Sequence, residues 1–177
     1  MSEWDGSRKQ IFQKFTGNLL RSRNMSNDLE KTVNELQESI MEDARKIYSE
    51  KVIERWLNPR NLGKIRTPDG FAKIKGPCGD TMQISFKVKD GTLSKIKFMT
   101  DGCASSIAAG SMTTELAQGK TVEEAAEISQ QMILNALDGL PEESVHCALL
   151  ASNILKEAIK NYLDSNKNKS LKGEAQG

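Results

Sequence analysis

The spacing of apolar residues changes along the chain, and each spacing predicts a different element. From Ser26 or Asn27, either of which can cap a helix, apolar residues recur every three or four positions, as on one helix face. The stripe comprises Leu29, Val33, Leu36, Ile40, Ala44, Ile47, Val52, Ile53, Trp56 and Leu57. Because Pro59 and Gly63 end it, we predict one amphipathic helix that packs on the following domain, forms a short coiled coil or docks a partner.

A second spacing, alternation of apolar and polar residues, begins near residue 81 and is typical of strands. The alternating apolar positions are Met82, Ile84, Phe86 and Val88, followed after a turn by Ile96, Phe98 and Thr100. The turn dipeptide Asp90-Gly91 between the two runs predicts an antiparallel hairpin with one buried face. A hairpin alone is marginal in water, so we expect residues 71–76 to add a third strand.

Helical spacing returns after the hairpin. It predicts one helix over about 105–116, ended by Gly119, a second over 121–137 that opens with a capping box, and a last one over about 142–163. These helices must cover the one apolar face of the sheet. The predicted fold class is therefore α+β, a small antiparallel sheet of about three strands covered by helices, with an extra N-terminal helix.

The length of 177 residues suits one domain with appendages. We expect a loosely ordered segment over 1–25, a helical extension over 26–47, a main domain over 48–163 and a disordered polar tail over 164–177. Lys and Arg total 25 against 24 Asp and Glu, so no overall field would recruit nucleic acid or an anionic membrane. Without a long apolar run, the chain is expected to be soluble and cytoplasmic.

The three cysteines lie where predicted elements meet. Cys78 precedes the hairpin and Cys103 follows it, and because the two arms are similar in length, both return to the same end of the sheet. Cys147 falls in the first turn of the last helix, where unpaired N–H groups and the helix dipole favour a thiolate. His146 directly precedes it, and Asp80 lies two residues after Cys78. Three thiols, one imidazole and one carboxylate are the candidate ligands.

This donor set suits either a tetrahedral zinc ion or a [2Fe-2S] cluster, since each takes four protein ligands and accepts histidine among them. Three thiolates with two weaker donors hold either one less firmly than four cysteines would. We therefore predict a site that can release its metal.

At these residues the sequence resembles the iron–sulfur cluster assembly scaffolds of the IscU type, also found as the N-terminal part of NifU. The similar stretches occur in family order over about 48–163: "YSEKVIERWLNPRNLG", "PCGD", "DGCASSIAAGSM", "GKTVEEA" and "LPEESVHCALLA". The resemblance implies a SufE/NifU-like fold. It also implies a scaffold, without turnover of its own, that builds a [2Fe-2S] cluster from iron and persulfide sulfur and transfers it to apo-proteins.

The resemblance also implies a role for each candidate ligand. Cys78, Cys103 and Cys147 match the three cysteines on which the family builds its cluster, and Asp80 matches an aspartate that keeps the cluster labile. His146 matches a histidine that joins the site when it holds zinc or iron. Cys147 matches the cysteine that accepts persulfide sulfur from a cysteine desulfurase.

The partners implied are that desulfurase, an electron donor such as ferredoxin, a frataxin-like protein, apo iron–sulfur proteins and a second copy of the chain, contacted through Tyr48. Where many family members read Leu-Pro-Pro-Val-Lys, residues 140–144 read Leu-Pro-Glu-Glu-Ser, which argues against hand-off to an Hsp70-type chaperone. Two alternatives stay open. One is a SufU-like sulfur acceptor that holds zinc and builds no cluster, and the other is an interaction protein with incidental thiols.

Overall fold

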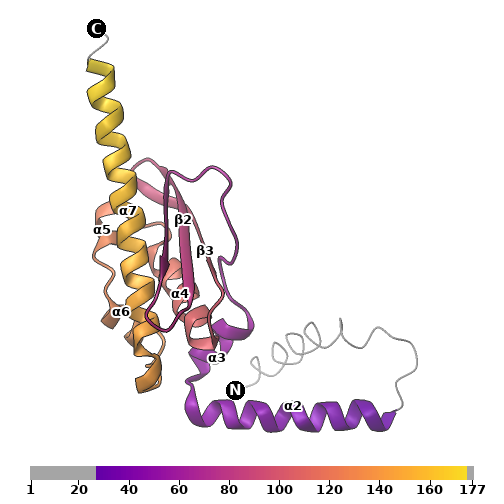
Figure 1. Ribbon diagram of the computed structural model, residues 1–177. Coiled ribbons are helices and arrows are strands. Elements are labelled where there is room, and N and C mark those ends of the chain that lie inside the picture. Colours follow the sequence, from indigo (N-terminus) through magenta and orange to yellow (C-terminus); the bar gives the residue numbers. More distant parts are fainter. Residues whose placement is uncertain (1–26, 175–177) are drawn as a thin grey trace. The chain divides into compact units, whose positions relative to one another are not determined.

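A computed structural model describes residues 27–174, and the side chains of residues 29–167 (Figure 1). The chain divides into two compact units between Ile47 and Tyr48. The described part of the first unit is helix α2, Asn27–Ile47, which begins at the predicted cap and carries the predicted apolar stripe. The loosely ordered segment predicted over 1–25 lies outside the described residues. Within the described part of the chain, no helix combines the length and the apolar character needed to cross a bilayer.

The second unit opens with helix α3, Glu50–Leu57, so the prediction of one unbroken helix from residue 26 to 57 is wrong. The break lies at Ser49, whose side chain caps α3 by accepting a hydrogen bond from the Val52 N–H at 3.2 Å. The same hydroxyl donates to the carbonyl of Leu137. A serine whose side chain bonds backbone groups in this way favours a helix start over a helix interior. The apolar spacing continues across the break, which is why the pattern alone did not reveal it.

The sheet has three antiparallel strands in the order β1-β2-β3: Gly70–Lys75, Thr81–Lys89 and Thr92–Thr100. Both the hairpin and the third strand were predicted. Asp90 and Gly91 have φ values of 52° and 75°, as the tight hairpin turn requires. Residues that alternate along the strands form the buried face, namely Ala72, Met82, Ile84, Phe86, Ile96 and Phe98.

Helices cover this one face of the sheet. Helices α4, Ala104–Ala117, and α7, Val145–Glu174, lie on it, and α5, Val122–Ala126, and α6, Gln130–Ala136, pack against these two helices, with a 3-10 turn η1 over Glu142–Ser144. Helix α7 packs on β1 and β2 while α4 packs on β3 (Figure 1). Gly110 lets α4 approach the sheet closely, because a Cβ there would lie 2.4 Å from the Phe98 ring. The predicted α+β class, with helices over a three-stranded sheet, is confirmed.

Two helix boundaries differ from the predictions. The helix predicted over 121–137 begins with the expected capping box but is interrupted, and Ser129 caps the second piece by accepting from the Met132 N–H. Helix α7 continues to Glu174, so the prediction that it ends near 163 and that a disordered tail follows is wrong for 164–174. No proline stands in that stretch, and an established helix gains one hydrogen bond for each residue added.

Candidate functional site

Three chain segments meet at one end of the sheet. The loop from β1 to β2 carries Cys78 and Asp80 and is closed by a hydrogen bond from the Gly76 N–H to the Asp80 carbonyl oxygen, 2.8 Å long. The hairpin then returns the chain to Cys103, the residue that precedes α4. Cys147 is the third residue of α7. The antiparallel hairpin thus brings distant parts of the sequence to one place, as its matched arms predicted.

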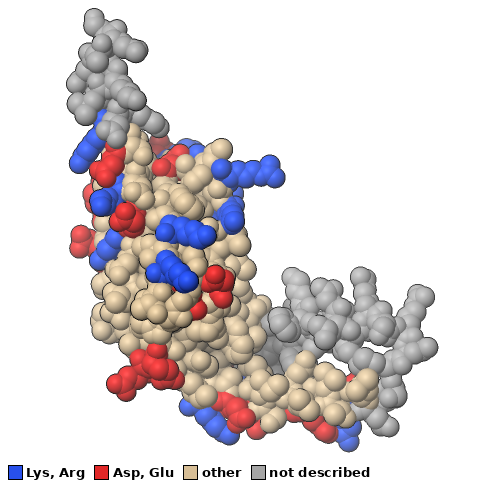
Figure 2. All heavy atoms as spheres, in the orientation of Figure 1, with Lys and Arg blue, Asp and Glu red and all other residues tan. Residues whose placement is uncertain are grey.

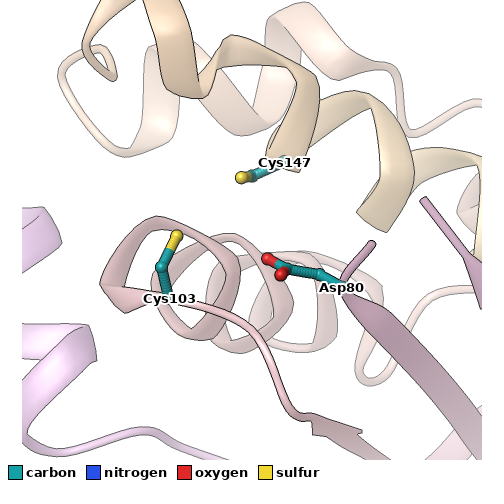
Figure 3. A group of neighbouring side chains, drawn as sticks. All are labelled: Asp80, Cys103 and Cys147. Carbon is teal, nitrogen blue, oxygen red and sulfur yellow. The ribbon is translucent and has the colours of Figure 1, made fainter. Parts of the chain in front are cut away.

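Asp80, Cys103 and Cys147 form a compact group. One carboxylate oxygen and the two Sγ atoms all lie within 4.8 Å of one another. Figure 3 shows the three side chains pointing toward a common space from the start of β2, the start of α4 and the first turn of α7. Cys103 is exposed and Cys147 is buried, so the group spans the surface and the core.

Ser106, in the first turn of α4, touches all three of these side chains. Its hydroxyl donates to Asp80 Oδ2 at 2.8 Å and lies 3.3 Å from the Cys147 Sγ. The Cys103 thiol lies 3.9 Å from the same oxygen. Ser106 itself is fully buried, so water does not compete for these contacts. Ser106 therefore lies at the buried side of the group, in contact with each of its members.

Gly102 makes room for the Asp80 carboxylate. A Cβ at this position would lie 2.3 Å from Asp80 Oδ2 and 2.6 Å from the Cβ of Ser106. Gly102 is therefore required by the close approach of two side chains and not by its backbone angle. Gly79, in the cysteine loop, supplies the unusual angle, with φ at +91° and open space around it.

The two cysteines of the group have opposite pKa shifts. Partial burial raises the pKa of Cys103, but hydrogen bonds from the backbone N–H groups of Ser106 and Ser105, together with the contact to the Ser106 hydroxyl, outweigh it, so that the pKa is lowered overall. Burial, with smaller contributions from the nearby Cys103 and Cys78 sulfurs, raises the pKa of the Cys147 thiol to about 11, against a lowering by the Ser106 hydroxyl. The prediction that the helix start makes Cys147 a thiolate is therefore wrong for the metal-free protein, because desolvation exceeds the dipole effect.

The other two predicted ligands lie beside the group. The His146 Nε2 atom is 3.6 Å from the Cys147 Sγ, but His146 is not part of the compact group. Cys78 is exposed and also lies outside it, although its sulfur is near enough to influence the pKa of Cys147. The structure thus brings three of the five predicted residues together and leaves two at the edge.

These side chains fit a transition metal. Ligand atoms around a tetrahedral zinc, with bonds of about 2.0 to 2.3 Å, are roughly 3.3 to 3.8 Å apart. The separation of His146 from Cys147 already falls in that range, and the atoms of the group of three, all within 4.8 Å of one another, lie at or within about 1.5 Å of it. Thiolates and an imidazole suit zinc or iron, while a carboxylate is the harder and weaker partner in the set.

Sequence reasoning missed Ser106. The only signal was a hydroxyl residue three positions after Cys103 in a predicted helix start, where serine is also an ordinary helix residue. Its contacts with Asp80 and Cys147 depend on the packing of α4 against α7, which the sequence pattern does not specify.

The chain is similar in sequence and in structure to known proteins. Residues 47–169 match the family described as NifU-like N terminal domain. The chain is 48% identical over 121 residues to iron–sulfur cluster assembly scaffold protein IscU 1 of Archaeoglobus fulgidus, covering 68% of this chain and 79% of that protein. It is 44% identical over 120 residues to the IscU scaffold of Haemophilus influenzae, covering 65% and 94%. Its structure resembles a candidate SUF-system scaffold, FiSufU of Fervidobacterium islandicum, with a TM-score of 0.53, 26% identity and coverage of 64% and 97%.

Proposed function

Because the chain belongs to the NifU-like N-terminal domain family, we propose that it acts as a scaffold on which an iron–sulfur cluster is assembled and from which the cluster passes to apo-proteins. The observation that supports this most directly is the meeting of Asp80, Cys103 and Cys147 from three separate elements. Iron, sulfide and the finished cluster are cargo in this function. The protein needs no turnover of its own, and the relatives are likewise named scaffold proteins.

For the cargo site we propose Cys78, Cys103 and Cys147 as the thiolate ligands, with Asp80 and His146 as the exchangeable ones. The compact group supplies three donors, and His146, whose Nε2 lies 3.6 Å from the Cys147 Sγ, and Cys78 are the candidates for a fourth. A [2Fe-2S] cluster takes four protein ligands of this kind, and zinc takes the same number. When bound, the metal favours the thiolate forms of the cysteines; the chain's own contribution is to hold these donors at one place.

We propose Cys147 as the sulfur acceptor, with Cys103 as its competitor. In this transfer the acceptor thiolate attacks the outer sulfur of a desulfurase persulfide, the S–S bond breaks, and the desulfurase cysteine leaves as a thiolate. Cys147 is only 1% exposed, so the transfer to it requires the start of α7 to open. Cys103 is exposed and has a lowered pKa. Mass spectrometry of the persulfide formed on Cys103→Ser and Cys147→Ser variants distinguishes the two acceptors.

The proposed partners are those that the family resemblance implies. A cysteine desulfurase delivers sulfur, an electron donor such as ferredoxin reduces it to sulfide, a frataxin-like protein assists, and apo iron–sulfur proteins receive the cluster in the cytoplasm. Glu142 and Glu143 are exposed in η1, and Figure 2 shows acidic side chains at that end of α7. An acidic surface there argues against the Hsp70-type hand-off. A homodimer through Tyr48, which is half-buried against the core, stays a prediction.

Anaerobic reconstitution tests the proposal. The protein is incubated with ferrous iron, cysteine, a desulfurase and dithiothreitol, which supplies the electrons that reduce persulfide sulfur to sulfide, and is then separated from free iron. We expect a visible sulfur-to-iron charge-transfer spectrum and bound iron and sulfide in equal amounts. A colourless protein that retains one tightly bound zinc would instead support the SufU-like sulfur acceptor. Retention of all metal by a variant with the three cysteines replaced by serine would contradict both functions.

A further inference from the structure

The hydroxyl of Ser106 lies at the point where the three donors of the compact group come closest. It is 2.8 Å from Asp80 Oδ2, 3.3 Å from the Cys147 Sγ and 3.9 Å from the Cys103 Sγ. A hydroxyl has one proton to donate and an oxygen that accepts, so it donates to the carboxylate while a thiol donates to it. Ser106 therefore connects the donor just before β2 with the donor just before α4 and the donor in the first turn of α7 through one short side chain.

We propose that Ser106 is a positioning residue that sets the separation of Asp80 from Cys147 and so determines how tightly the site binds metal. The inference rests on the proposed metal-binding function and adds a residue to it. Groups that hydrogen-bond to metal ligands fix the ligand orientation, and their loss typically lowers metal affinity by about 10- to 100-fold.

The surroundings of Ser106 leave it little freedom. Its side chain is fully buried, and its Cβ lies so near Gly102 that a Cβ on that glycine would be 2.6 Å away. The Asp80 carboxylate lies in the same confined space, 2.3 Å from that position. Without the serine hydroxyl, the carboxylate loses its buried donor and is free to turn toward solvent, where it no longer faces Cys147.

Zinc affinity measures this role directly, because zinc binding requires neither a desulfurase nor a reductant. Zn²⁺ is titrated against a chromophoric chelator in the wild type, Ser106→Ala, Asp80→Ala and the double variant. We expect Ser106→Ala to weaken zinc binding about tenfold in the wild-type background. In the Asp80→Ala background we expect less than a twofold further loss, since the serine would then have no carboxylate to hold.

Two serines supply controls for general effects of removing a buried hydroxyl. Ser105 is equally buried beside it and, within the described residues, its hydroxyl has no hydrogen-bond partner. Ser152 is buried in α7 and donates to the carbonyl of Ile128 at 2.9 Å, away from the site. We expect Ser105→Ala and Ser152→Ala to keep the zinc affinity within twofold, although Ser152→Ala loses a hydrogen bond. Thermal unfolding without metal separates stability from affinity.

Three results would overturn the inference in recognisable ways. A Ser106→Ala variant with unchanged zinc affinity would show that the hydroxyl positions nothing. Equal losses in the wild-type and Asp80→Ala backgrounds would show a general structural effect that does not act through the carboxylate. A wild-type protein that binds no zinc and no iron would overturn the proposed metal site itself, and the inference with it.

Discussion

Replacing Gly102 by alanine should displace the Asp80 carboxylate from the site. The added Cβ would lie 2.3 Å from Asp80 Oδ2, where ordinary contact begins at 3.4 Å, so that oxygen must move by about 1 Å. The Cβ of Ser106, 2.6 Å away, belongs to a buried helix and cannot turn aside. The φ of Gly102 is not positive, so an alanine would not strain the backbone there. The steric clash of its Cβ is therefore the whole effect of the substitution.

The displaced carboxylate weakens both metal binding and the hydrogen bond from Ser106. We expect a loss of zinc affinity of about 10- to 100-fold, which corresponds to about 1.4 to 2.7 kcal/mol. The free energy of unfolding of the metal-free protein should fall by about 1 to 2 kcal/mol, because a buried hydroxyl loses a charged acceptor.

Chelator competition measures the zinc affinity of Gly102→Ala, and urea unfolding measures its stability. Gly110→Ala is the matched control, since its new Cβ would lie 2.4 Å from the Phe98 ring and so strains the core, not the site. We expect the control to lose stability and keep its zinc affinity. Zinc binding by Gly102→Ala within twofold of the wild type would refute the claim that Asp80 is held against Gly102 when metal binds.

Three further predictions concern the site and the fold. In the metal-free protein, iodoacetamide should modify the exposed Cys103 before the buried Cys147. The modification rate of Cys147 should keep rising toward pH 11 as its thiolate forms. Mass spectrometry that finds Cys147 modified first would contradict this order of pKa values. Asp80→Ala should retain a reconstituted cluster longer, because the Asp80 charge disfavours the Cys103 thiolate; faster loss of the visible spectrum would exclude this role. Ser49→Ala should lower the free energy of unfolding, measured in urea, by about 1 to 2 kcal/mol, because it removes the cap of α3 and the hydrogen bond to the Leu137 carbonyl. An unchanged urea midpoint of unfolding would argue against the cap.

The sheet was predictable because its signals are local. Alternating residues and the Asp90-Gly91 turn specify the hairpin, and the marginal stability of a lone hairpin requires the third strand. The breaks at Ser49 and Ser129 were not predictable from spacing, since the apolar period runs through both. What breaks each helix is a serine side chain that bonds a backbone N–H, and serine is common in helices as well.

The site was predictable as a meeting of residues but not in its electrostatics. Hairpin geometry alone places the loop of Asp80 beside Cys103. The protonation of Cys147 depends on how deeply the start of α7 is buried, and the sequence places that residue only in a first turn. A helix terminus contributes about 0.3 to 1 kcal/mol to a charge, whereas burial can shift a pKa by several units. Only the smaller of these two effects is visible in the sequence.

The core explains how this protein can release a metal and stay folded. Its largest buried side chains, Phe86, Phe98, Ile154 and Leu155 among them, pack sheet against helices, and of the compact donor group only Cys147 belongs to this core. In small zinc domains the metal supplies the folding free energy, so that losing it unfolds the chain. Here the donors sit at the ends of three elements whose packing is already complete. Binding therefore adds a stability that grows only with the logarithm of the ligand concentration over its dissociation constant. Transfer to a recipient costs the scaffold no more than that increment.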